Sequence, residues 1–110
     1  MNNDKLALIR QFSAKITTHF DVNSLTVYNQ FEKIYGDTID CVLLERYLSL
    51  SCTTIFKEDK NSSLVSHINY ESKLYVFIFK SKNADAFDGV EPQYIIDELK
   101  ALVRKLGEVN

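Results

Sequence analysis

The side chains of this chain best suited to nucleophilic or metal chemistry are two histidines and two cysteines, namely His19, His67, Cys41 and Cys52. A catalytic Cys–His pair needs contact between the two side chains and a third group that orients the base. Zinc sites bring their ligands in closely spaced pairs such as C-x-x-C or H-x-x-x-H. Neither signature is present, and the three glycines stand too far apart to form a phosphate-binding loop. We therefore expect no enzyme, no catalytic residue, no metal ligand and no cofactor; His19 ends a helix, and His67 lies on the wetter face of a strand.

Charge is distributed unevenly over the C-terminal half of the chain. Residues 83–98 hold five acidic side chains and no lysine or arginine. An acidic loop that carries an aromatic side chain suits a basic protein surface, because the charge speeds encounter and the ring can anchor the complex. The candidate partner-binding residues are Asp85, Phe87, Asp88 and Glu91. The alternative is a loop that only caps a helix, with Phe87 packed in the core.

Lysine, in contrast, is enriched over residues 51–82. The side chains concerned are Lys57, Lys60, Lys73, Lys80 and Lys82. They form a nucleic-acid surface in one interpretation, and in the other they keep the protein soluble and protect the edges of strands.

Composition limits the class of protein. The chain has 110 residues, a formal net charge of -2 and 45% hydrophobic residues, which is typical of one globular domain and argues against a general binder of nucleic acid or anionic membranes. No apolar run approaches the roughly 20 residues of a membrane span. The N-terminal residues lack the order of a signal peptide. We therefore expect a cytoplasmic protein with a single α+β domain over residues 1–110, in which Cys41 and Cys52 are reduced and buried.

The element that must organise this domain is the run from Leu74 to Phe79, in which every residue is apolar. Its β-branched and aromatic composition predicts a strand, and successive side chains of a strand point to opposite faces. A strand that is apolar on both faces belongs in the middle of a sheet that is covered on both sides. The run resembles the RNA-binding strand of RRM domains, whose exposed rings stack on bases. Because Leu74 and Val76 stand where such strands carry glycine, we interpret the rings as core.

Helical spacing of apolar residues predicts four helices. The first covers about residues 3–19, and the second carries a stripe over residues 27–35 that ends at Gly36, although a short strand over residues 26–28 stays open. The third covers residues 38–50 and is apolar on two faces. The last begins at Pro92 and ends near Gly107.

Strands are predicted over residues 51–56, 64–70 and 74–79, and the last two form a hairpin. Helices set against a small antiparallel sheet give an α+β fold with N-terminal helices, a three-stranded antiparallel sheet and a C-terminal amphipathic helix.

The same order of elements also fits a winged-helix DNA-binding regulator. The second helix, the turn at Gly36 and the third helix would form the helix-turn-helix. The third helix carries Asp40 and Glu45 but only Arg46 as a base, and a helix that reads the major groove normally presents basic or amide side chains. DNA binding is therefore the second hypothesis.

The leading hypothesis is a small non-catalytic interaction protein, that is, a regulator, an inhibitor or immunity-type protein, or an adaptor that binds a protein partner. The wide apolar stripe of the last helix also suggests a homodimer, because contiguous apolar patches usually mark interfaces. The candidate interface residues are Tyr94, Ile96 and Val103.

Overall fold

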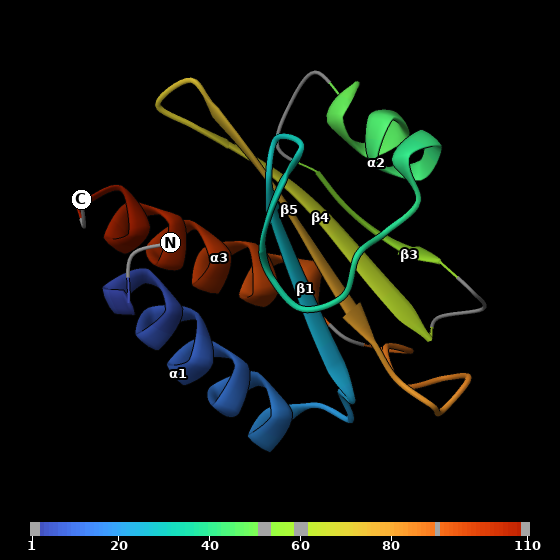
Figure 1. Cartoon of the computed structure of the whole chain (residues 1–110). Coiled ribbons are helices and arrows are strands. Elements are labelled where there is room, and N and C mark those ends of the chain that lie inside the picture. Colours follow the sequence, from blue (N-terminus) through green and yellow to red (C-terminus); the bar gives the residue numbers. More distant parts are fainter. Residues whose placement is uncertain (1–2, 51–53, 59–61, 90, 109–110) are drawn as a thin grey trace.

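Figure 1 shows a computed structural model of the chain, which describes residues 3–50, 54–58, 62–89 and 91–108. A five-stranded antiparallel sheet has two helices on one face and one helix on the other. In chain order the elements are α1 (Asn3–His19), β1 (Ser24–Asn29), β2 (Glu32–Tyr35), α2 (Cys41–Leu48), β3 (Thr54–Glu58), β4 (Ser63–Tyr70), β5 (Lys73–Lys80) and α3 (Pro92–Glu108). The α+β class is confirmed, but the sheet has five strands and not three.

Strand β5 lies in the middle of the sheet, as its composition predicts. The strand order is β2-β1-β5-β4-β3, and all neighbours are antiparallel. Phe77 of β5 lies opposite Val27 of β1 on one side and Ser66 of β4 on the other. A strand paired on both sides in this way has its backbone hydrogen bonds satisfied along its whole length.

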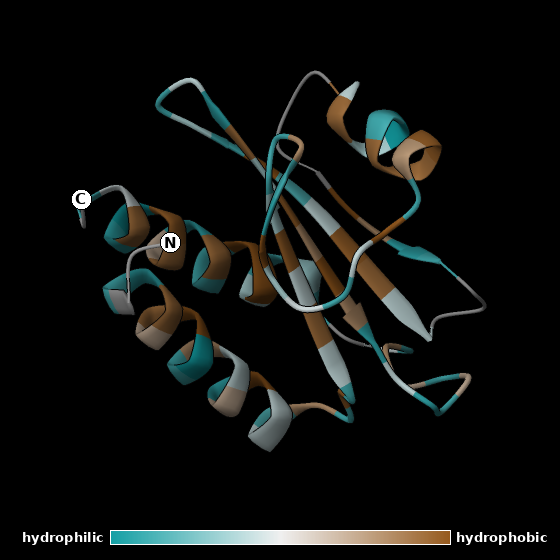
Figure 2. Ribbon diagram, viewed as in Figure 1, coloured by the Kyte–Doolittle hydropathy of each residue, from teal (hydrophilic) through white to brown (hydrophobic). Residues whose placement is uncertain are grey.

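The two faces of β5 contribute to two separate cores. Tyr75, Phe77 and Phe79 pack in the cluster beneath α1 and α3, whereas Val76 and Ile78 pack in the cluster beneath α2. Figure 2 shows the corresponding hydrophobic segments along the middle of β4 and β5 and hydrophilic segments at the turn between them. The three rings are 0–2% exposed, so core packing is confirmed and no exposed aromatic face is left for bases to stack on.

The prediction of a second helix before Gly36 is wrong. Residues 24–35 form the hairpin of β1 and β2, with the turn at Gln30 in a left-handed conformation (φ 54°). Spacing of the apolar residues fits a helix and a strand equally over so short a run, and pairing of β1 with β5 decides for the strand. Without this helix, the helix-turn-helix expected for a winged-helix regulator does not occur in the described part of the chain.

Helix α2 is shorter than predicted and buries one face only. Asp40 caps it by accepting a hydrogen bond from the backbone N–H of Leu43 (3.2 Å). Leu44 and Tyr47 are buried against the sheet, but Val42 is 73% exposed. The helix therefore buries one side, which includes Leu44 and Tyr47, and is not covered on two faces as predicted.

Helices α1 and α3 lie side by side on the opposite face of the sheet (Figure 1). Helix α3 begins at Pro92 as predicted and includes Gly107 as a helical residue. Among the described residues, none of the helices combines the length and the apolarity that a membrane crossing needs.

Candidate functional site

The acidic loop between β5 and α3 is tied to the body of the protein. Phe87 is 1% exposed and belongs to the core beneath α1 and α3. Backbone hydrogen bonds from Ala86 to Asn83 (3.2 Å) and from Asp88 to Asp85 (3.1 Å) form successive turns before and after this ring. The buried ring and the turns therefore hold the backbone of the loop from Asn83 to Asp88 in place.

At its base, the loop is attached to the start of β1 and to β4. The side-chain oxygen of Asn23 accepts a hydrogen bond from the backbone N–H of Lys82 (2.6 Å), and Ser81 donates to the carbonyl oxygen of Ser62 (2.9 Å). The loop thus begins from fixed backbone at the same end of the sheet where α1 ends.

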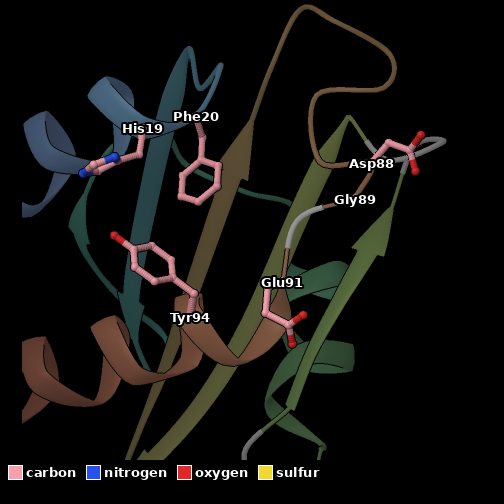
Figure 3. A pocket seen from close by; sticks show the side chains of 6 residues that line it. All are labelled: His19, Phe20, Asp88, Gly89, Glu91 and Tyr94. Atoms are coloured by element: carbon pink, nitrogen blue, oxygen red, sulfur yellow. The ribbon is translucent and has the colours of Figure 1, made fainter.

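The end of α1, this loop and the start of α3 enclose a pocket of about 480 Å³, here called the end pocket (Figure 3). It is open to solvent. Three lining residues are aromatic or imidazole side chains, and two are carboxylates; the full set is His19, Phe20, Asp88, Gly89, Glu91 and Tyr94. The end pocket therefore combines flat apolar surface with negative charge.

The three rings of the end pocket form one cluster. The centroid of Tyr94 lies 6.0 Å from that of Phe20 and 6.4 Å from that of His19, and the interplanar angles are 58° and 75°. His19 and Phe20 are 6.5 Å apart. Tilted rings at these distances attract one another edge to face and do not cover each other's faces completely.

The lysine of α1 nearest in sequence to the end pocket binds a carboxylate of α3 rather than Asp88 or Glu91. Lys15, one turn before His19, forms an ion pair with Glu98 of α3 (Nζ to Oε2, 2.7 Å). The hydrogen bond to Glu98 raises the pKa of Lys15. Among the described residues that line the end pocket, none is lysine or arginine, and His19 is the basic side chain there.

The four predicted partner-binding residues do not all lie at the end pocket. Asp88 and Glu91 line the end pocket, and Asp85 is exposed on the same loop. Phe87 is buried, so the alternative, a ring packed in the core, is confirmed, and the prediction of an exposed aromatic anchor is wrong. The exposed aromatic surface next to the carboxylates comes instead from Phe20 and Tyr94.

The three predicted dimer-interface residues differ in burial. Val103 is fully buried in the core between α3 and the sheet, so its assignment to an interface is wrong. Ile96 is half-buried, and Tyr94, at 38% exposure, belongs to the end pocket. The apolar stripe is wide because α3 packs against both the sheet and α1.

The histidines and cysteines do not come together among the described residues. His19 ends α1 as predicted, but His67 is completely buried rather than on a wet face, because β4 is paired on both edges and covered on both faces. Cys41 is a free thiol, exposed at the start of α2 rather than buried, and Cys52 lies outside the described residues. No group of three or more metal-ligating side chains occurs in the part of the chain that the structure describes.

The described lysines of the sheet region lie on different elements. Lys57 is on the edge strand β3, Lys73 and Lys80 are at the two ends of β5, and Lys82 follows β5; all four are exposed, and Lys60 lies outside the described residues. By the register of β3, β4 and β5, Lys57, Lys80 and Lys82 lie at one end of the sheet, and Lys73 lies at the other end of β5. The four lysines therefore do not form one continuous surface, and solvation of strand ends fits their positions.

A second polar cluster joins α2 to the sheet. The hydroxyl of Tyr47 donates a hydrogen bond to Glu58 of β3 (2.6 Å), and Arg46 also binds that carboxylate. The Arg46 guanidinium lies 5.1 Å from the centroid of the Tyr47 ring. These contacts hold the only described helix on this face against an edge strand, which indicates a structural role.

We expect Tyr47→Phe to lower the free energy of unfolding by about 1–2 kcal/mol near neutral pH, because the hydrogen bond to Glu58 is lost. Burial and that hydrogen bond raise the pKa of Tyr47 to about 12. A pKa raised in the folded state stabilises the fold below the ordinary pKa of 10.0, and this contribution is lost as the pH rises through about 12. The difference in unfolding free energy between wild type and variant should therefore shrink over this range, as measured by urea denaturation.

The matched control is Tyr35→Phe on the edge strand β2, where the side chain is half-buried. The same measurement on this variant separates the effect of removing any tyrosine hydroxyl from that of removing the hydroxyl that binds Glu58. A Tyr47→Phe difference that stays constant up to about pH 12 would contradict the assigned role of the hydroxyl.

No protein-family model matches this chain, and none of the curated proteins or solved structures compared with it shows a significant similarity. Function therefore has to be inferred from the surface of the chain itself. Among the described residues, the end pocket brings together a cavity, a ring cluster and two carboxylates, with no lysine or arginine in its lining.

The sequence predicts only some of the residues that line the end pocket. The composition of the loop predicts Asp88 and Glu91 as binding residues, whereas His19 is predicted only to end a helix and Phe20 has no predicted role. They reach the pocket because α1 packs beside α3, and the Lys15–Glu98 pair that accompanies this packing joins residues 83 positions apart. The available signal was the aromatic pair at the end of α1, which an isolated helix does not need.

Proposed function

We propose that this chain is a non-catalytic protein-interaction module that binds a basic segment of a partner protein at the end pocket. A regulator, an inhibitor and an adaptor all act by binding of this kind. The observation that carries the proposal is the presence of Asp88 and Glu91 in one open pocket with the rings of Phe20 and Tyr94. Carboxylates attract and orient a basic segment, and aromatic surface contributes contact area that excludes water.

Anchoring of the loop supports this function. Because Phe87 is buried and the turns are hydrogen-bonded, the backbone beside Asp88 loses little conformational freedom when a partner binds. Preorganisation of this kind reduces the entropic cost of association.

The test is fluorescence anisotropy with short, capped, labelled peptides in which glycine alternates with arginine, lysine or neutral citrulline. We expect the arginine and lysine peptides to bind, the citrulline peptide to bind more weakly, and binding to weaken as salt rises from about 20 to 300 mM. Asp88→Asn together with Glu91→Gln should weaken binding of the basic peptides about three- to tenfold at low salt, which is the range for two exposed ion pairs.

A charge-matched variant controls for net charge. Glu32→Gln together with Glu45→Gln removes two exposed carboxylates from β2 and α2, away from the end pocket, and should leave binding nearly unchanged. Equal weakening by both double variants would mean that only the overall charge matters, and the proposal would then fail. Absence of binding by every basic peptide would overturn it as well.

We also propose that the protein forms a homodimer and is located in the cytoplasm. The exposed position of Tyr94 supports a homodimer. The free thiol of Cys41 supports a cytoplasmic location, because free thiols are typical of reducing compartments. A second copy of the chain is the competing occupant of the end pocket. Sedimentation equilibrium at micromolar concentration distinguishes a second copy of the chain from a different partner. If a dimer forms through the end pocket, its association constant should differ between wild type and the Asp88→Asn/Glu91→Gln variant.

A further inference from the structure

We infer that the end pocket selects arginine over lysine, and that the group it takes is the guanidinium of an arginine side chain in the partner segment. This inference rests on the proposed function, because it names the chemical group that the same pocket recognises. Both side chains carry one positive charge, so the carboxylates alone do not distinguish them. Discrimination has to come from the rings.

The ring cluster provides flat surface of the size of a guanidinium. Tyr94 is 38% exposed, although Phe20 and His19 lie 6.0 and 6.4 Å from it. All three rings line the end pocket, and Tyr94 is the one whose exposed fraction leaves room for contact with a partner. A planar, weakly hydrated guanidinium stacks on such a face, whereas an ammonium group is compact and holds its water more strongly.

The carboxylates lie on the other side of the end pocket from the rings, and in Figure 3 their oxygens point away from the rings. In Figure 3 the rings of His19, Phe20 and Tyr94 gather on one side of the end pocket, and Asp88 and Glu91 lie across it on the loop and at the start of α3. Both carboxylates are on exposed residues, so their side chains can rotate to accept hydrogen bonds at the rim. A guanidinium presents five N–H donors around its edge and can stack and donate at once.

The pocket is also kept free of the protein's own cation. Lys15 lies one helical turn before His19 on α1, and its ammonium is held by Glu98 at 2.7 Å. A partner arginine therefore does not have to displace an internal ion pair of Asp88 or Glu91 among the described contacts. With a volume of about 480 Å³, the end pocket has room for one long side chain and its nearest water molecules.

The experiment compares the arginine and lysine peptides on wild type, Tyr94→Leu and Tyr94→Phe. Wild type should bind the arginine peptide about three- to tenfold more tightly than the lysine peptide, the range expected for a cation on an aromatic face. Tyr94→Leu should remove most of this preference while retaining salt-dependent binding of both peptides. Tyr94→Phe keeps the ring and should keep the preference.

The matched control is Phe31→Leu. Phe31 is 62% exposed at the turn between β1 and β2, at the opposite end of β1 from the end pocket, so its loss should leave both affinities unchanged. In two-dimensional NMR spectra of wild type, the arginine peptide should shift the amide signals of Phe20, Gly89 and Tyr94 more than that of Phe31.

Equal affinity of wild type for the two basic peptides would overturn the inference and leave the proposed function standing. Failure of both peptides to bind would overturn the proposed function first. If Tyr94→Leu does not fold, as judged by circular dichroism, the wild-type preference, its retention in Tyr94→Phe and the location of the NMR shifts decide the question. A preference that persists in a folded Tyr94→Leu variant would show that another surface discriminates.

Discussion

Replacing Phe77 with alanine should lower the free energy of unfolding by about 3–5 kcal/mol, a large share of the ~5–15 kcal/mol of a typical domain. The side chain is completely buried in the central strand β5. Its ring lies 6.5 Å from that of Phe12 on α1 and 6.3 Å from that of Tyr75. Truncation leaves a cavity between the sheet and α1 that the paired strands on both sides cannot close. Urea denaturation followed by circular dichroism measures the effect.

Phe31→Ala is the control for this truncation. The same atoms are removed from a side chain that is 62% exposed, so the change in unfolding free energy should stay within about 0.5 kcal/mol. An unchanged denaturation midpoint for Phe77→Ala would mean that the ring is accessible, and the aromatic face of β5 would then have to be considered again as a binding surface.

Gly36→Ala should destabilise the protein by roughly 2–5 kcal/mol. Gly36 has a φ of +88°, a left-handed conformation that costs a residue with a side chain about 1–2 kcal/mol. A β-carbon at this position would also collide with the carbonyl oxygen of Leu25 and lie 2.8 Å from the Cα of Thr26, both in β1. Since these atoms belong to paired backbone, the hairpin has to shift. Thermal and urea denaturation should both record the loss.

Gly107→Ala is the matched control within the same chain. Gly107 lies in α3, and an added β-carbon would meet the ring of Tyr70 at 3.5 Å, which is ordinary contact. Alanine is the better helix former by about 1 kcal/mol, so this variant should be as stable as wild type or slightly more stable. Similar losses at both positions would show that the effect at Gly36 does not come from its conformation.

Gly36 also shows why part of the fold was mispredicted. In the sequence it follows an apolar stripe at helical spacing and was interpreted as the residue that ends a helix. In the structure it follows β2 and allows the chain to pass closely over β1. Both interpretations require the same residue type for the same reason, a positive φ, and the sequence offers no local means of choosing between them.

The candidate site divides in a similar way. Negative charge near Asp88 and Glu91 was evident from composition, because charge is a property of residue types alone. The sequence does not determine whether the side chain of Phe87 is buried or exposed, because an aromatic residue in a polar loop can point inward or outward. In the structure Phe87 is buried in the core beneath α1 and α3, and the packing of these helices also brings Phe20 beside Tyr94.

The sequence by itself determined the α+β class, the central strand β5, the terminal helices α1 and α3 and the acidic character of the loop. These features follow from local periodicity and composition, which act over a few neighbouring residues. Only the tertiary structure decided that residues 24–35 are strands, that Val103 is core and that His19, Phe20 and Tyr94 share a pocket with the acidic loop. Those outcomes depend on pairing with β5 and on the packing of α1 against α3, which are contacts between distant parts of the chain.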